Sequence, residues 1–467
     1  MAGNAYKRRV SPVERLFTRS PYSIVAVVAR IKGEVTECLL VQAVSKVRQR
    51  HTNLRVRIEE DAEGRPWFTS EGVGEIAIQV VPRTSGDRWI QVYHEACRVP
   101  FKFGTQPAIR LILVQSAAES ELILFCHHLI CDGLSLAYLA RDLMVHLGDP
   151  TREAEPLPDP VPISLDNMPE ELSLNPIAQF FVRRINRKWQ AESVFFDQAD
   201  YEALNQAYWA NYTHQMLPIE LSEPETTALV GRCRAQSVTV NSALTAAFVG
   251  AQVEVQGDRP YHSRVGVAAS LRERLPHPAG EVMGFFAGVA ALKFGYDPRK
   301  GFWDNARKLH RKLQPRFTDK VLFEDPLAWC YLDPSIMEAI HFKRLGGLVP
   351  EHLASHDKLA AFARRDDVVL GVLKREKMDD LERKAMGTAM TNLTRMDFPR
   401  QYGALELDRL IMNPGGAFPL VSVNLVVGAV TCSGKLSLLL EYAEQAVDTG
   451  TVEQVRDRAM ALLLGDR

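Results

Sequence analysis

The sequence predicts a mixed α/β protein, of the α+β kind, built from two lobes of similar texture. Strand-like and helix-like segments follow one another in both halves of the chain, whose 467 residues allow two separate cores. Between the halves, residues 149–167 contain five prolines, which interrupt regular structure and predict a linker. We place the boundary after the helix that follows this linker, so the lobes are expected at 1–193 and 194–467.

The first half begins with a strand and a helix. The apolar, β-branched run 22–31 predicts the strand, and Thr36 is suited to cap a helix with an apolar side. The leucines after Gly133 have helical spacing and predict a helix that ends near Gly148. Further apolar segments predict strands at 54–58, 76–81, 108–115 and 121–126, and a helix at 175–190.

The second half repeats this alternation without any short-period repeat, which disfavours a solenoid. Residues 340–390 are rich in charge and predict no definite element. Strands are expected at 214–221, 264–269, 285–294, 405–412, 420–427 and 436–442. Helices are expected at 224–235, 241–255, 301–313 and from Val452 onward.

Composition excludes several classes of protein. The chain is 46% hydrophobic and 24% charged with a net charge of -1, which disfavours a disordered chain or a nucleic-acid binder. Seven scattered cysteines without a Cys-x-x-Cys pair predict reduced thiols rather than disulfides or a structural zinc site. The N-terminus has no secretory signal and no run reaches the length of a membrane span. We therefore expect a cytoplasmic protein with no membrane or nucleic-acid partner and no bound metal.

The most informative stretch runs from Phe125 to Ser135, Phe-Cys-His-His-Leu-Ile-Cys-Asp-Gly-Leu-Ser. An apolar strand before it and a helix after it predict that a histidine lies in the turn between them. This is an arrangement in which a catalytic base is presented to a substrate. We assign His128 as a general base, because an imidazole with an unperturbed pKa near 6.5 is suited to proton transfer worth about two to four powers of ten. His127 should point to the other side of the strand, and we assign it a structural role.

The motif residues His127, His128, Asp132 and Gly133 resemble the His-His-x-x-x-Asp-Gly signature of the condensation-domain acyltransferase superfamily. That superfamily includes nonribosomal peptide condensation domains, polyketide-associated acyltransferases, alcohol acetyltransferases and, distantly, chloramphenicol acetyltransferase. The segments that agree with it are Arg-His-x-x-Leu-Arg at 50–55, Pro-Phe and Pro-Ala-Ile-Arg within 100–110, and looser matches at 240–244, 270–272, 283–286 and 392–403. Lys102 replaces a usual aspartate and Thr394 a common glycine.

This resemblance implies two chloramphenicol-acetyltransferase-like lobes in a V, with an active-site tunnel between them. A donor that carries phosphopantetheine, on a carrier protein or as coenzyme A, would enter one mouth, and a small-molecule alcohol or amine would enter the other. No bound cofactor is expected. The chain would act alone, as a monomer, and take an acyl or peptidyl carrier protein in trans.

Residues around the motif also have expected roles, of which the pairing of Asp132 is the one that the resemblance implies. Asp132 is expected to pair with an arginine of the first lobe, either Arg55 or Arg110. Its position is also that of an acid that orients the histidine, as in a catalytic triad. Gly133 permits a tight turn, and its N–H group is a candidate to hold an oxyanion. Three second-lobe residues are candidates for substrate binding: Ser270 and Asn392, which otherwise serve turns or strand ends, and Arg272, which otherwise forms a surface ion pair.

Other interpretations of the motif remain open. His127 and Asp132 fit the His-x4-Asp spacing of glycerolipid acyltransferases, which would make His127 the base. Cys126 and Cys131 are more typical of small buried apolar side chains than of nucleophiles, and adjacent strand histidines diverge too far to chelate a metal together.

Two other functions remain open. They are an acyl-CoA-dependent alcohol O-acyltransferase and a non-catalytic module that docks carrier proteins.

The chain also has two basic helical segments. Acidic carrier proteins and the phosphates of coenzyme A both favour positive charge at a tunnel mouth, although basic helix faces are more often simply solvated. The basic residues are Arg183, Arg184, Arg187 and Lys188 in one segment and Arg299, Lys300, Arg307, Lys308, Arg311 and Lys312 in the other.

Overall fold

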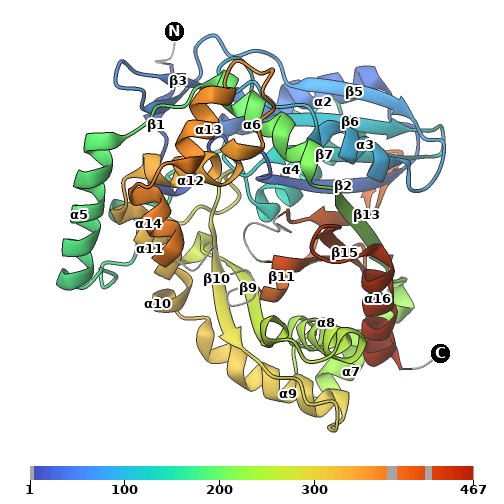
Figure 1. Ribbon diagram of the computed structural model, residues 1–467. Coiled ribbons are helices and arrows are strands. Elements are labelled where there is room, and N and C mark those ends of the chain that lie inside the picture. Colours follow the sequence, from blue (N-terminus) through green and yellow to red (C-terminus); the bar gives the residue numbers. More distant parts are fainter. Residues whose placement is uncertain (1–4, 376–385, 416–422, 466–467) are drawn as a thin grey trace.

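A computed structural model of the protein describes residues 5–375, 386–415 and 423–465. Two six-stranded sheets, each with its own helices, form two lobes that meet near the centre of the molecule, and a group of helices covers one side (Figure 1). The predicted fold class, mixed α/β with two lobes, is confirmed. Nothing among these residues qualifies as a single helix able to cross a membrane; only the pair 223–235 and 240–256, bent by 95°, passes on length and composition together.

The first sheet has the strand order β12-β13-β2-β7-β6-β5 and is antiparallel except for the pair β5 and β6. Its central strands are almost continuously apolar and buried, as expected of a sheet covered on both faces. The strands are β2 (Ile24–Lys32), β5 (Ala77–Pro82), β6 (Ile109–Gln115), β7 (Glu119–His127), β12 (Gln401–Tyr402) and β13 (Leu405–Asn413). The helices beside it are α2 (Glu37–Arg50), α3 (Arg88–Cys97) and α4 (Gly133–Gly148), and β1 (Lys7–Arg9), β3 (Arg57–Glu60) and β4 (Pro66–Thr69) form a small separate sheet.

The second sheet has the order β10-β9-β11-β14-β15-β8, with β11 parallel to both of its neighbours and the other pairs antiparallel. Its strands are β8 (His214–Glu220), β9 (Arg264–Ser270), β10 (Ala287–Lys293), β11 (Met386–Met396), β14 (Val423–Cys432) and β15 (Lys435–Ala443). Its helices are α7 (Glu223–Ala235), α8 (Val240–Gln256), α9 (Phe302–Leu313) and α16 (Thr449–Leu464). Helix α8 is buried along most of its length between this sheet and the outer helices.

A helical layer lies beside both sheets and has its own apolar core (Figure 1). Its centre is a stack of Phe196 on Phe342, with ring centroids 3.9 Å apart. The helices are α1 (Pro12–Arg15), α5 (Pro176–Glu192), α6 (Gln198–Asn211), α10 (Asp319–Leu322), α11 (Glu324–Tyr331), α12 (Pro334–Leu345), α13 (His356–Arg364) and α14 (Val368–Arg375). Helices α12 to α14 occupy much of 340–390, where the sequence predicted no definite element.

The lobe boundary at 193/194 stays a prediction, but the sheets themselves do not divide there. Strands β12 and β13 belong to the second half of the chain and yet pair with β2 in the first sheet. Because β13 also contacts β14 and β15 of the second sheet, it connects the two sheets.

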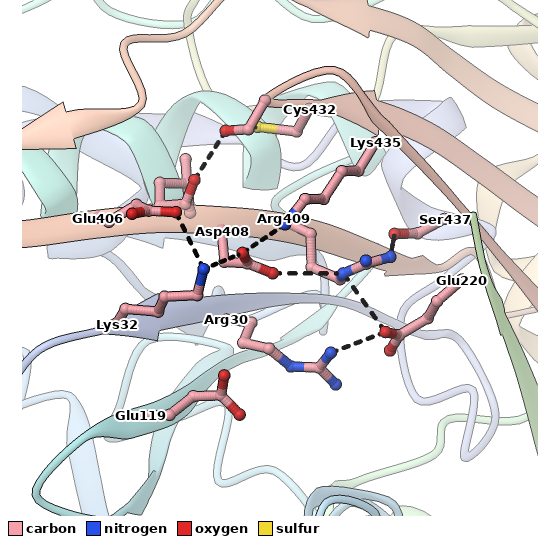
Figure 2. A network of polar contacts seen from close by, with 12 residues as sticks. Arg30, Lys32, Glu119, Glu220, Glu406, Asp408, Arg409, Cys432, Lys435 and Ser437 are labelled. Carbon is pink, nitrogen blue, oxygen red and sulfur yellow. Dashed lines mark hydrogen bonds and ion pairs between the residues drawn. The ribbon is translucent and has the colours of Figure 1, made fainter. Parts of the chain in front are cut away.

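Charged residues line this junction (Figure 2). Glu220 of β8 accepts a hydrogen bond from Arg30 of β2 at 2.8 Å and lies 3.4 Å from the Nε of Arg409 in β13. Asp408 accepts from Lys32 at 2.8 Å and from Lys435 of β15. The four strands that meet here are therefore held together by ion pairs as well as by apolar contacts.

Most predicted strands and long helices are found within a few residues of their expected bounds. The expected strand 54–58 is instead a short 3-10 turn followed by β3. The expected strand 420–427 lies partly outside the described residues, and the described part continues as β14 to Cys432. The proline-rich segment 149–167 has no helix or strand apart from a 3-10 turn at 165–167, as its composition predicts.

Candidate active site

The turn between β7 and α4 places His128 at the junction of the two lobes. Strand β7 ends at His127, and the backbone N–H of His128 donates to the carbonyl of Ser23, at the start of the neighbouring strand β2. The imidazole is fixed by two carbonyl groups, with Nδ1 3.1 Å from the oxygen of Cys131 and Nε2 3.3 Å from that of Pro414. Pro414 follows β13, so one of these oxygens comes from a segment 286 residues away in the sequence.

A neutral imidazole carries one proton and can donate to only one of these carbonyls. A proton on Nδ1, given to Cys131 in the same turn, leaves the lone pair on Nε2, which is the arrangement that a general base needs. After Nε2 gains a second proton, the ring donates to both carbonyls.

The surroundings of His128 favour the neutral ring. Phe17 and Phe285 contact it with ring centroids at 5.2 and 5.6 Å. Burial lowers the pKa of His128 below 6.5, while the two carbonyls oppose this shift. The side chain nevertheless keeps part of its surface exposed.

His127 is buried and faces the other way, toward Phe101 and Phe103. Its Nε2 lies 3.0 Å from the carbonyl of Ser20, to which it donates, and its Nδ1 accepts from the N–H of Leu129. Burial lowers the pKa of His127 to about 3. With both nitrogens occupied and no exposure, this ring is in no position to act as the base, which disfavours the His-x4-Asp interpretation.

Asp132 caps helix α4 and binds the second half of the chain. Its Oδ1 accepts from the N–H and hydroxyl of Ser135, both at 2.8 Å, and from the guanidinium of Arg272 at 2.7 Å. Its Oδ2 accepts from the N–H of Phe286 at 3.1 Å. Asp132 thus binds the motif to the second half of the chain. Among the described residues the hydrogen bonds of the His128 ring go to Cys131 and Pro414, whereas in a triad one of them would go to Asp132.

The expectation that Asp132 pairs with Arg55 or Arg110 is wrong. Arg55 is exposed, and Arg110 donates to the carbonyls of Ala96, Val99 and Pro100. The partner is Arg272, which also donates to Ser135 and to the carbonyls at 280 and 282. No local sequence pattern predicts this pairing, because Asp132 and Arg272 are 140 residues apart.

The assignment of Arg272 to substrate binding or to a surface ion pair therefore also needs correction. The residue is 2% exposed, and its guanidinium donates to Asp132, Ser135 and the carbonyls at 280 and 282. Its guanidinium carbon lies 4.8 Å from the ring centroid of Phe286. Arg272 stabilises the lobe junction behind the site.

A cavity of about 790 Å³ opens beside the motif, between the start of α4 and strands β9, β10 and β11. Asp132, Gly133, Ser270 and Asn392 are among its lining residues, whereas His128 is not. Ser270 is exposed there. Asn392 accepts a hydrogen bond from the N–H of Thr394, which has a positive φ, so it also supports a turn in β11. Their contact with a substrate stays a prediction.

Gly133 lies where two side chains of the second half of the chain pack against the motif. A Cβ at this position would come within 3.0 Å of Leu393 and 3.2 Å of Met412, so a larger residue would displace both. None of the hydrogen bonds found among the described residues uses the N–H of Gly133, which opens helix α4. This group is free to donate to an anionic oxygen in the cavity.

Sequence reasoning missed one wall of the cavity. Arg141 forms two hydrogen bonds of 2.6 Å with Glu281, and its guanidinium carbon lies 5.5 and 5.6 Å from the ring centroids of Tyr138 and Phe398. All four residues line the cavity. The only available signal was the spacing of Tyr138 and Arg141 on one face of α4, because Glu281 and Phe398 come from distant segments.

Neither a cysteine nucleophile nor a metal site is supported at the motif. Cys126 and Cys131 are fully buried, and burial raises the pKa of the Cys131 thiol far above its ordinary value. In the part of the chain that the structure describes, no three His, Cys, Asp or Glu side chains are placed to hold a metal ion together.

Comparison with known proteins links the motif to a family. Residues 6–160 match the Condensation domain family. A linear gramicidin synthase of Brevibacillus parabrevis is 29% identical over 144 residues, which cover 29% of this chain and 3% of that protein. Cyclosporin synthetase simA of Tolypocladium inflatum is 24% identical over 240 residues, or 50% of this chain and 1% of that protein. The chain spans only a small part of these curated relatives.

Solved structures show that the fold extends over the whole chain. Trichothecene 15-O-acetyltransferase from Fusarium sporotrichioides has a TM-score of 0.64 at 12% identity, covering 99% of this chain and 96% of that one. Polyketide synthase associated protein 5 from Mycobacterium tuberculosis has a TM-score of 0.59 at 15% identity and 97% coverage of both chains. The epimerization domain from the third module of tyrocidine synthetase B also has a TM-score of 0.59, at 12% identity, covering 99% of this chain and 96% of that one.

The resemblance drawn from the motif is therefore confirmed: the first third of the chain matches condensation domains, and the whole chain has their fold.

Proposed function

We propose that this protein is a condensation-type acyltransferase. It moves an acyl group from a phosphopantetheine thioester, held on an acyl or peptidyl carrier protein, to the hydroxyl or amine of a small acceptor. The observation that supports this most is the geometry of His128, whose Nδ1 is fixed by a carbonyl of its own turn while Nε2 lies 3.3 Å from the carbonyl of Pro414.

In this reaction Nε2 of His128 removes the proton from the acceptor as its oxygen or nitrogen attacks the thioester carbon. The carbonyl π electrons move to oxygen, and the resulting oxyanion accepts a hydrogen bond from the N–H of Gly133. When the tetrahedral intermediate collapses, the carbon–sulfur bond breaks and the imidazolium returns its proton to the thiolate. The ester or amide and the free thiol leave, and the ring is neutral again.

The carbonyls of Cys131 and Pro414 assist this cycle. The first keeps the base in the required tautomer in the resting state. The second accepts a hydrogen bond once Nε2 is protonated, so it lowers the energy of the imidazolium formed during the reaction. The buried environment opposes permanent protonation, which keeps the base available near neutral pH.

A carrier-protein donor fits better than coenzyme A because the part of the chain around the motif matches condensation domains of peptide synthetases. The fold alone does not decide, since it also occurs in an O-acetyltransferase and an epimerization domain. The carrier protein would act in trans on a monomer of this chain, which light scattering of the protein with and without a carrier would test.

The deciding experiment compares two donors. The protein is incubated with acyl-loaded carrier protein or with the matching acyl-CoA, together with a panel of alcohols and amines, and intact-mass spectrometry follows the donor. Loss of the acyl group with matching product from the carrier alone supports the proposal. Product from coenzyme A alone would instead identify an acyl-CoA-dependent alcohol O-acyltransferase. Tight binding of the loaded carrier without product for any acceptor would identify a docking module.

A further inference from the structure

A second cavity lies at the opposite end of β9 and β10 from the candidate active site. Ser270 and Ala287 pair at the active-site end of these strands, and Arg264 and Lys293 pair at the other end, six residues away. At about 3.3 Å per residue this separates the two ends by about 20 Å. The second cavity has a volume of about 510 Å³ and shares no lining residue with the first.

Four cations converge on this cavity. They come from four elements: Arg264 from β9, Lys293 from β10, Lys312 from the last turn of α9, and Arg316 from the turn that follows. The other lining residues are Val265, Ala291, Leu292 and Met386, so the lining holds no carboxylate. We call this site the basic cavity.

None of these four side chains has a hydrogen-bond or ion-pair partner within the described ranges. Two of their nitrogen atoms, Nη1 of Arg264 and Nε of Arg316, are also buried from solvent without a partner. A buried N–H group that hydrogen-bonds neither to water nor to the protein destabilises the folded state, and neighbouring like charges repel one another.

Two other cations of the same helix, and one just before it, have partners, while Arg311 is exposed to solvent outside the cavity. Arg307 donates to Asp304 and Gln236, and Lys308 donates to the carbonyl of Gly295. Arg299, just before the helix, binds Asp297. Lys312 is therefore the one cation of this basic segment that lines the cavity, and none of the described lining residues offers it a carboxylate.

We propose that the basic cavity binds a phosphate-bearing ligand. Guanidinium groups match the oxygens of a phosphate with paired hydrogen bonds, and the two lysines add further positive charge. A bound phosphate would give Nη1 of Arg264 and Nε of Arg316 the acceptors that they lack. The cavity is larger than a single phosphate, and its apolar side, formed by Val265, Ala291, Leu292 and Met386, suits an uncharged group attached to it.

Two sources would supply this chemistry: the nucleotide end of coenzyme A, or the phosphopantetheine arm of a carrier protein. The proposal concerns phosphate binding and stands whether or not acyl transfer occurs at His128. The probes for the two sources are adenosine 3′,5′-bisphosphate and pantetheine 4′-phosphate, with inorganic pyrophosphate as a probe for the phosphate contacts alone.

Isothermal titration calorimetry of the full chain, at constant ionic strength, tests the proposal. Binding of at least one of the three probes is expected, and R264Q and R316Q should each weaken it by about tenfold or more, because each removes a charge-assisted hydrogen bond. K312Q is a second, exposed variant in case the arginine variants fold poorly, and it should weaken binding in the same direction. R311Q is the matched control, because Arg311 is an exposed cation of the same helix outside the lining.

The proposal is overturned if none of the probes binds, or if R311Q weakens binding as much as R264Q and K312Q. Tighter binding of adenosine 3′,5′-bisphosphate identifies the nucleotide source, and tighter binding of pantetheine 4′-phosphate identifies the carrier arm. H128A separates this proposal from the catalytic one, since it should abolish turnover and leave probe binding unchanged.

Discussion

At the scale of single residues, two adjacent histidines in the same motif have opposite environments. Strand alternation predicts that they face opposite sides, and the structure gives His127 a closed set of partners and His128 a ring that keeps some exposure. The sequence singled out His128 as the candidate base but did not predict its contact with the Pro414 carbonyl or the role of the Arg272 guanidinium. Both come from segments more than a hundred residues away, and no local pattern encodes such a distance.

The pKa of His128 predicts how activity depends on pH. Because burial lowers this pKa below 6.5, the ring stays neutral, and able to accept a proton, to a lower pH than an exposed histidine. We expect kcat/KM to be constant near neutral pH and to fall on the acid side with an apparent pKa below 6.5. A pH–rate profile with a stable thioester donor measures this, and an acid limb centred above 7 would contradict the assigned environment.

The Asp132–Arg272 pair predicts a large effect on stability. R272Q leaves the buried carboxylate without its charged partner, which typically costs about 3 to 5 kcal/mol of unfolding free energy. R55Q is the control, because Arg55 is exposed, and should change stability by less than about 0.5 kcal/mol. Urea unfolding measures both. The double variant D132N/R272Q should be less destabilised than the sum of its single variants, and strict additivity would argue against the pairing.

At the scale of elements, helices and strands with a clear apolar period were predictable, and elements that depend on tertiary contacts were not. Helix α4 was predicted from its leucines and is buried along most of its length. Helices α10 and α11 in the helical layer were missed, since they are short and their apolar residues pack against β10 and against other helices. The placement of β13 in the first sheet was also beyond prediction, because its apolar pattern fits either sheet.

The junction at β13 predicts a salt-dependent contribution to stability. E220Q removes the negative charge that both Arg30 and Arg409 contact. Because Arg409 is buried, water cannot readily replace the lost contact. We expect a loss of about 1 kcal/mol at low salt that diminishes as salt screens the pair. Thermal unfolding at several salt concentrations measures this. E153Q, which affects an exposed pair with Lys46, should have almost no effect, and equal effects of the two variants would contradict the account.

At the scale of the whole molecule, two separate cores and a helical layer meet around the motif. The candidate site therefore depends on how the lobes are joined, through Asp132, Pro414 and the ion pairs of the β13 junction. Length and alternating texture were enough to predict two lobes. They were not enough to predict the crossing of the chain back into the first sheet, which brings Pro414 to His128.

Buried histidines predict that the whole protein loses stability in mild acid. Burial lowers the pKa of His127 to about 3 and that of His341 to about 4, below the ordinary 6.5 that applies when the chain is unfolded. The unfolded chain therefore binds protons that the folded chain excludes as pH falls below 6.5. At pH 5 each group should lower the unfolding free energy by up to about 2 kcal/mol relative to pH 7.

Urea unfolding at pH 7 and pH 5 measures this loss. H341Q, which keeps a donor and an acceptor for Leu16 and Tyr22, should reduce the difference between the two pH values. H277Q, at an exposed position, should leave it unchanged. A wild-type protein equally stable at both pH values would contradict the assigned burial.

The most direct test of the account is a single-turnover reaction between acyl-loaded carrier protein and an accepted nucleophile, with wild type and H128A compared at equal enzyme excess. If Nε2 of His128 removes the acceptor proton, acyl transfer to the acceptor should slow by about a hundredfold or more in H128A, with binding of the loaded carrier retained. A variant that folds, binds the carrier and transfers the acyl group at the wild-type rate would contradict the central claim.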